Sequence, residues 1–137
     1  MGLGSVSYIQ PEEVAAILKG PRSGTMLVVD VRDYDYAGGH IKGAVNITAD
    51  EFSQDEDVDA LVQKVRAGGH ERVVFHCMLS QQRGPFCAKR FAERQAAVGA
   101  EGSPLVQVLQ LGFQNFQKLY FQDESLVEDW DGRVWQR

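Results

Sequence analysis

Cysteine is scarce in this chain of 137 residues, which contains only Cys77 and Cys87. Two thiols cannot form the disulfide network that holds many small secreted domains together, and alone they cannot supply the four ligands of a structural zinc site. We therefore expect no bound metal and a core held by apolar packing. Such low cysteine usage also suits a reducing compartment, so we expect the protein in the cytoplasm or the nucleus.

Long apolar stretches and an excess of basic charge are missing as well. No hydrophobic run approaches the roughly 18 residues of a membrane span, and residues 1–13 lack the basic and apolar blocks of a secretory signal. The 14 basic and 19 acidic side chains give a net charge of −5, which argues against general nucleic-acid binding. We therefore expect neither a membrane nor a nucleic acid as a partner.

Short β-rich runs alternate with helical patterns along the chain, which is typical of an α/β fold with a central parallel sheet. The length fits one domain, residues 1–137. The expected strands are residues 7–9, 26–30, 44–47, 72–76 and 105–109, and the expected helices are residues 11–20, 57–66, 84–97 and 112–121. The polar tail, residues 122–137, contains two tryptophans, so we expect it to pack on the body of the domain.

Charge is unevenly distributed along the chain. Residues 50–59 contain six acidic and no basic side chains, whereas residues 76–95 contain four basic side chains and one acidic side chain. Charge runs of this kind are typical of solvated helix faces. Because the basic side chains follow directly after Cys77, we interpret this run as the surroundings of an anion site.

Chemistry is concentrated in the segment HCMLSQQRGP, residues 76–85. A buried strand ends at His76, and a loop from Cys77 to Arg83 leads into the next helix. Ligands of open α/β sheets bind beyond the carboxyl ends of the strands, and the free amides of a helix N-terminus attract anions. The same field stabilises a thiolate, and a guanidinium matches two oxygens of a tetrahedral oxyanion. We predict that Cys77 is a nucleophile and that Arg83 clamps an oxyanion.

Two motifs carry a resemblance to a known family. The pattern His-Cys-x5-Arg-Gly-Pro resembles the loop of the cell-cycle dual-specificity phosphatases with a rhodanese fold, and more closely that of the rhodanese-fold arsenate reductases of plants and fungi. The stretch VVDVRDYDYAGGHIKGAVNI, residues 28–47, is similar to another hallmark of that superfamily. The resemblance runs from about residue 7 to residue 121. It implies a rhodanese-like α/β fold with a central parallel sheet of about five strands flanked by helices.

The resemblance also implies roles for individual residues. It makes Cys77 the nucleophile and Arg83 the residue that binds the oxyanion. The loop that donates backbone amides to the substrate corresponds to Met78, Leu79, Ser80, Gln81 and Gln82. The residues that tie the second motif to the sheet correspond to Asp30, Arg32 and His40. The residues themselves favour the same structural role for His40, and a packing and loop-orienting role for His76.

Loop length separates the enzymes of this superfamily. Sulfurtransferases typically place four residues in the loop, enough for a persulfide, whereas the five residues here make a wider cradle for phosphate or arsenate. We therefore expect a small oxyanion substrate. Our first interpretation is an arsenate reductase without a bound cofactor, which uses glutathione with glutaredoxin and also has phosphatase activity. A protein tyrosine or dual-specificity phosphatase is the alternative, and a thiosulfate sulfurtransferase or a non-catalytic redox or phosphate-binding module stays open.

The identity of a general acid and the role of the second thiol stay open. A phosphatase needs a general acid, but no carboxylate lies between Cys77 and Arg83. The acidic residues that could supply it from elsewhere are Asp33, Asp35, Asp123, Glu124 and Glu128. Cys87, which matches a cysteine of the plant-type enzymes, is either a resolving thiol or a small core residue of the following helix.

Overall fold

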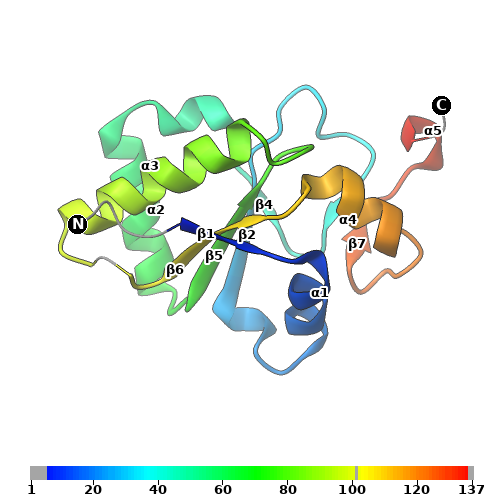
Figure 1. Cartoon of the computed structure of the whole chain (residues 1–137), viewed down its shortest axis with the longest axis horizontal. Coiled ribbons are helices and arrows are strands. Elements are labelled where there is room, and N and C mark those ends of the chain that lie inside the picture. The colour runs from blue at the N-terminus through cyan, green and yellow to red at the C-terminus, as the bar shows by residue number, and fades with distance from the viewer. Residues whose placement is uncertain (1–5, 101, 136–137) are drawn as a thin grey trace.

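A five-stranded parallel sheet forms the centre of the computed structural model, which describes residues 6–100 and 102–135 (Figure 1). In spatial order its strands are β1 (Val6–Ile9), β6 (Leu105–Leu109), β5 (Arg72–His76), β2 (Met26–Asp30) and β4 (Val45–Asn46). The main helices are α1 (Pro11–Lys19), α2 (Asp55–Ala67), α3 (Arg83–Ala97) and α4 (Gly112–Tyr120). Within the described ranges no helix combines the length and the apolarity needed to cross a membrane.

Helices cover both faces of this sheet. Figure 1 shows α2 and α3 on one side and α1 and α4 on the other. Side chains of the central strand β5 alternate between the two: Val73 and Phe75 pack with α2 and α3, whereas Val74 packs with α1 and α4. Because a central parallel strand is buried on both faces, the residues inside β5, at 73–75, are all apolar rather than alternating with polar ones.

The expected α/β fold with a parallel sheet is confirmed, and its five strands and four helices lie within two residues of their expected bounds. The structure adds elements that were not expected. These are an antiparallel ribbon of β3 (His40–Ile41) and β7 (Val127–Glu128), two 3-10 helices, η1 (Ser23–Thr25) and η2 (Ala49–Phe52), and a last short helix, α5 (Gly132–Trp135). Each is too short to produce a periodic pattern in the sequence.

The described part of the C-terminal tail, residues 122–135, packs on the body. Trp130 Nε1 donates to Gln117 Oε1 at 2.9 Å, and Trp135 Nε1 donates to the carbonyl of Gly38 at 2.9 Å. The Trp135 ring also lies 5.8 Å from the Phe113 ring of α4. The tail therefore closes over the loop between β2 and β3, which carries part of the second motif.

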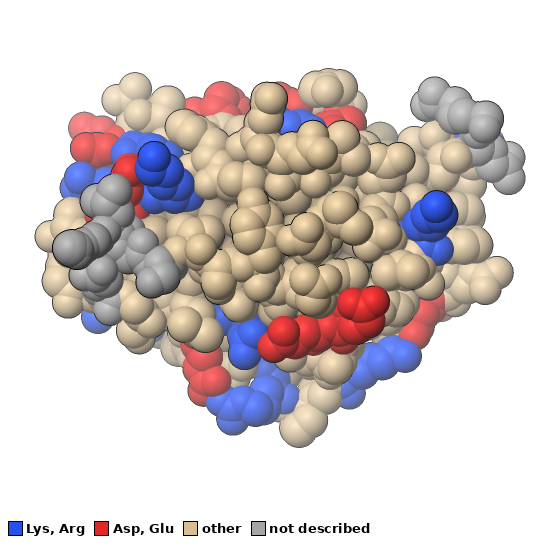
Figure 2. Space-filling model, in the orientation of Figure 1, with Lys and Arg blue, Asp and Glu red and all other residues tan. Residues whose placement is uncertain are grey.

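The two oppositely charged runs face each other between α2 and α3. Arg94 binds Asp59 through hydrogen bonds of 2.7 and 3.0 Å, and Arg90 donates to Asp55 at 2.7 Å. Figure 2 shows blue and red side chains next to one another at this end of the molecule. The interpretation of the basic run as the surroundings of an anion site is therefore wrong for these two arginines, because they hold α3 against α2. Of the other two basic residues of the run, Arg83 lines the Cys77 cleft and Lys89 does not.

Candidate active site

The predicted nucleophile lies at the carboxyl end of the middle strand, β5. Cys77 is 3% exposed, and its Sγ accepts a hydrogen bond from the backbone N–H of Gly84 at 3.3 Å, at the start of α3. A backbone N–H at the start of a helix has no acceptor within the helix, so it is available to stabilise negative charge on the sulfur. The cleft outside this sulfur has a volume of about 450 Å³ and is lined by Asp33, Tyr34, Asp35, Cys77, Met78, Leu79, Gln81, Gln82 and Arg83.

Helix α4 holds the beginning of the loop from Cys77 to Arg83. The first amides of α4 donate to loop carbonyls: Phe113 N–H to Cys77 O and Gln114 N–H to Met78 O, both at 3.0 Å. His76 Nδ1 lies 3.0 Å from Cys77 O and must be the protonated nitrogen, because a carbonyl only accepts. Burial lowers the pKa of His76, so the ring is neutral and orients the loop without acting as an acid at neutral pH.

The close approach of α4 depends on Gly112, which the sequence did not single out. Its φ of +67° is in the left-handed region, and a Cβ on it would lie 2.4 Å from Met78 O. No side chain fits between helix and loop, so the two backbones meet directly. The preceding residue, Leu111, has the same φ of +67° without being a glycine.

A fully buried ion pair supports the second motif. Arg32 donates to both carboxylate oxygens of Asp30, with Nη2 to Oδ2 at 2.6 Å and Nε to Oδ1 at 2.9 Å. It also donates to the carbonyls of Gly39 at 2.9 Å and Asp35 at 3.2 Å. His40 lies apart from this pair and contacts Glu128 Oε1 of β7 at 3.1 Å. The Asp30–Arg32 pair thereby anchors the loop that faces Cys77.

The predicted oxyanion clamp is bound to that loop. Arg83 Nη1 donates to Asp35 Oδ1 at 2.9 Å, Nη2 donates to Asp35 Oδ2 at 2.7 Å, and Nη1 reaches Asp33 Oδ1 at 3.4 Å. These hydrogen bonds lower the pKa of Asp35 and raise that of Arg83. Asp35 is therefore ionised at neutral pH and carries no proton to give to a leaving group.

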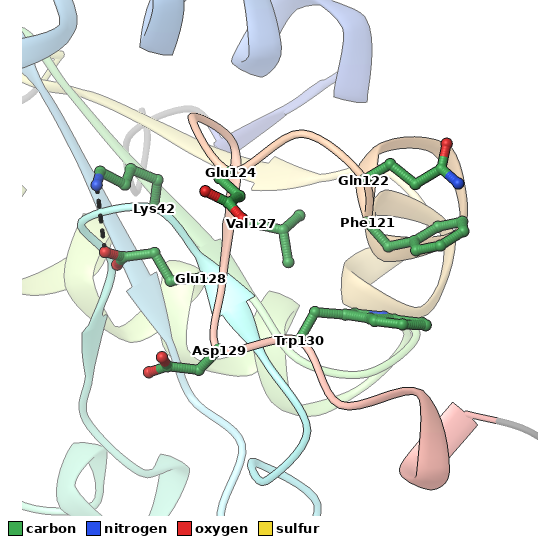
Figure 3. Close-up of a pocket in the computed structure, with 8 residues that line it drawn as sticks. All are labelled: Lys42, Phe121, Gln122, Glu124, Val127, Glu128, Asp129 and Trp130. Carbon is green, nitrogen blue, oxygen red and sulfur yellow. Dashed lines mark ion pairs between the residues drawn. The ribbon is translucent and has the colours of Figure 1, made fainter.

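The remaining acid candidates lie elsewhere. Asp123 pairs with Lys19 at 2.6 Å. Glu124 and Glu128 line a separate hollow of about 800 Å³, which Figure 3 shows beside the Phe121 and Trp130 rings. This hollow shares no lining residue with the Cys77 cleft. Of the five acids proposed from the sequence, Asp33 and Asp35 alone line the cleft.

The second thiol is enclosed in the core. Cys87 lies on α3 and is fully buried, and burial, followed by the charge of Cys77, raises the pKa of its thiol to about 12. Ser80 is also buried, and its hydroxyl has no hydrogen-bond partner among the described residues. Within those same residues, no group of three or more histidines, cysteines or carboxylates is arranged to hold a metal ion.

Comparison with known proteins identifies the family. A family model described as a rhodanese-like domain matches residues 10–119. The chain belongs to the rhodanese-like family. Its relatives include the CDC25-like phosphatase YCH1 of Saccharomyces cerevisiae, 33% identical, with 96% of this chain and 95% of that protein covered. The dual specificity phosphatase ibp1 of Schizosaccharomyces pombe is 29% identical, with 92% and 99% covered.

Solved structures of rhodanese-like proteins agree with this assignment. The yeast protein tyrosine phosphatase Ygr203w superposes with a TM-score of 0.82 at 32% identity, over 96% of this chain and 97% of that chain. The As-Sb reductase of Leishmania major superposes with a TM-score of 0.81 at 32% identity, over 87% and 81%. This rhodanese-like chain thus stands among relatives named as phosphatases and a solved As-Sb reductase, and the Cys77 cleft is its candidate active site.

Proposed function

We propose that this rhodanese-like protein is an arsenate reductase with Cys77 as its nucleophile. The observation that carries the proposal is the state of the acids in the cleft. Asp35 is held ionised by Arg83, and the loop itself contains no carboxylate. Cleavage of an ordinary phosphate ester needs a proton donor for the leaving oxygen. Dihydrogen arsenate carries two acidic hydroxyls, and the proton of one can pass to the other, which then leaves as water, so its reduction needs no such donor from the protein.

The reaction proceeds in two steps. The Cys77 thiolate attacks the arsenic of dihydrogen arsenate and forms an S–As bond. One As–O bond breaks, and that hydroxyl leaves as water after taking the proton of the second hydroxyl. Arg83 and the loop amides hold the remaining oxygens during this step. The thiolate of glutathione then attacks the Cys77 sulfur. An S–S bond forms, the S–As bond breaks, and its electron pair stays on arsenic, which leaves as arsenite with arsenic reduced from +5 to +3.

An external thiol is the better second nucleophile. The internal alternative, Cys87, is fully buried, and its pKa of about 12 keeps it protonated at neutral pH. The mixed disulfide between Cys77 and glutathione would then be reduced by a second thiol, which makes glutaredoxin the expected protein partner. No cofactor needs to stay bound in this sequence of steps.

Phosphatase activity is the second candidate, and two observations favour it. YCH1 and ibp1 are both named as phosphatases, and the cleft of about 450 Å³ has room for more than one tetrahedral anion. The Asp33 side chain, 53% exposed at the cleft, is the acid left to protonate a leaving group. Esters with acidic leaving groups, such as p-nitrophenyl phosphate, would be the substrates least dependent on that proton.

One set of assays separates these activities. The protein and Cys77→Ser are incubated with arsenate, glutathione and glutaredoxin, and in parallel with p-nitrophenyl phosphate and with thiosulfate plus cyanide. We expect arsenite from the wild type and none from the variant. Ester cleavage without arsenite would reject the reductase in favour of the phosphatase, and thiocyanate alone would favour a sulfurtransferase. No turnover in any assay would favour a binding module.

A further inference from the structure

We propose that Asp35 is the positioning residue that presents one defined edge of the Arg83 guanidinium to the oxyanion. This inference rests on the proposed function, because it assumes that an oxyanion binds beside Cys77. It concerns a residue that the sequence offered only as a general acid, a role for which its lowered pKa makes it unsuitable.

The Arg83 guanidinium has more donors than its carboxylate partners use. A guanidinium carries five N–H groups, two on each Nη and one on Nε. Asp35 takes one N–H from Nη1 and one from Nη2, at 2.9 and 2.7 Å, and Asp33 takes a second from Nη1 at 3.4 Å. Among the described residues no further hydrogen bond from Arg83 occurs, so Nε–H and the second Nη2–H remain.

These two remaining donors form a pair. Nε–H and the outer Nη2–H lie in the guanidinium plane and point in parallel from one edge of the group. Their spacing matches that of two oxygens of a tetrahedral anion. Asp35 binds the two Nη atoms at the end of the guanidinium, so the edge formed by Nε–H and Nη2–H stays open for a ligand. The same bidentate contact fixes the plane of the guanidinium. Both Arg83 and Cys77 line the same cleft, so an anion bound within it can contact both residues.

Asp35 is itself firmly held. Its side chain is only 13% exposed, and its carbonyl accepts a hydrogen bond from Nη1 of the buried Arg32 at 3.2 Å. Arg32 is fixed in turn by Asp30 of β2. Arg83 is therefore connected to the sheet through Asp35, Arg32 and Asp30. Its long side chain is held in one conformation before the anion binds.

The test is the binding of sodium tungstate, a tetrahedral dianion, to the full-length protein, measured by titration calorimetry. Asp33→Asn is the matched control, because it removes the same charge beside the same guanidinium without removing the bidentate contact. We expect Asp35→Asn to bind tungstate roughly tenfold to thirtyfold more weakly than Asp33→Asn, since an unheld arginine loses its rotamer freedom on binding. Asp35→Glu, which retains a carboxylate, should recover part of that loss.

Two results would overturn the proposal in different ways. If the wild type binds tungstate and Asp35→Asn binds it as tightly as Asp33→Asn or more tightly, Asp35 competes with the ligand and does not position the clamp. If the wild type itself binds no tungstate, the oxyanion site and the proposed function fall together. Thermal unfolding checks that each variant is folded, and Asp35→Ala, with the same two outcomes, replaces Asp35→Asn if that variant is not.

Discussion

Replacing Gly112 by alanine tests how the active-site loop is held. Gly112 has a φ of +67°, and the added Cβ would lie 2.4 Å from Met78 O, where ordinary contacts begin at 3.4 Å. The loop and α4 would have to separate by about 1 Å, which breaks the hydrogen bonds from Phe113 N–H to Cys77 O and from Gln114 N–H to Met78 O. Cys77, the proposed nucleophile, would move with them.

The expected cost has two parts. A left-handed conformation costs an alanine about 1–2 kcal/mol, and each lost hydrogen bond costs about 1 kcal/mol. We therefore expect Gly112→Ala to lower the free energy of unfolding by about 3–4 kcal/mol. Gly43→Ala is the control, because Gly43 has a similar φ of +77° but no atom within 4 Å of its added Cβ. That variant should lose only the conformational part, about 1–2 kcal/mol.

Urea unfolding followed by circular dichroism measures both variants, and tungstate binding follows the site. Gly112→Ala should weaken tungstate binding, whereas Gly43→Ala should leave it within twofold of the wild type (about 0.4 kcal/mol). If the two variants lose the same stability within about 0.5 kcal/mol, the contact between Gly112 and the loop carries no energy and the reasoning is refuted.

Three further predictions concern single residues. Cys87→Ala should keep arsenate turnover with glutathione and glutaredoxin within about twofold of the wild type. It should lower the free energy of unfolding by about 1–2 kcal/mol, because it leaves a small cavity in the core. Loss of turnover would make Cys87 the resolving thiol. Leu111→Gly should raise the free energy of unfolding by about 0.5–1 kcal/mol, because glycine adopts the left-handed backbone conformation of this position without strain. A destabilised variant would contradict this. Arg83 lowers the pKa of Asp35, so the pair stabilises the fold fully above the unfolded pKa of about 4 and loses this stabilisation as pH falls through the folded value. The stability difference between wild type and Asp35→Asn should therefore shrink below about pH 4; a difference that stays constant down to pH 2 would rule out the ion pair as its source.

The order of strands and helices was readable from the sequence because each main element repeats its pattern. The apolar residues 73–75 within 72–76 indicate a strand buried on both faces, and the spacing in 57–66 indicates an amphipathic helix. The β3–β7 ribbon was not readable, since each of its strands spans two residues and its partners lie more than 80 residues apart. Pairings of this kind depend on where the tail meets the body.

The charge runs show the limit of local reasoning. Nothing near Arg90 or Arg94 in the chain reveals that they bind Asp55 and Asp59, because these acids belong to α2, more than thirty residues earlier. Only the packing of α3 on α2 distinguishes these structural arginines from Arg83, which faces the cleft. Local composition therefore assigned one role to the whole basic run, although Arg90 and Arg94 bind α2 and Arg83 lines the cleft.

The scarcity of cysteine and the spacing from Cys77 to Arg83 by themselves determined the chemistry to be expected, because a nucleophile, a loop and a cation at a helix start are adjacent in the chain. Tertiary structure alone decided which acid touches the clamp, how deeply Cys87 is enclosed, and that Gly112 meets the loop. Each of these depends on contacts between distant segments, and the pKa of a carboxyl or a thiol is set by such neighbours rather than by its place in the sequence.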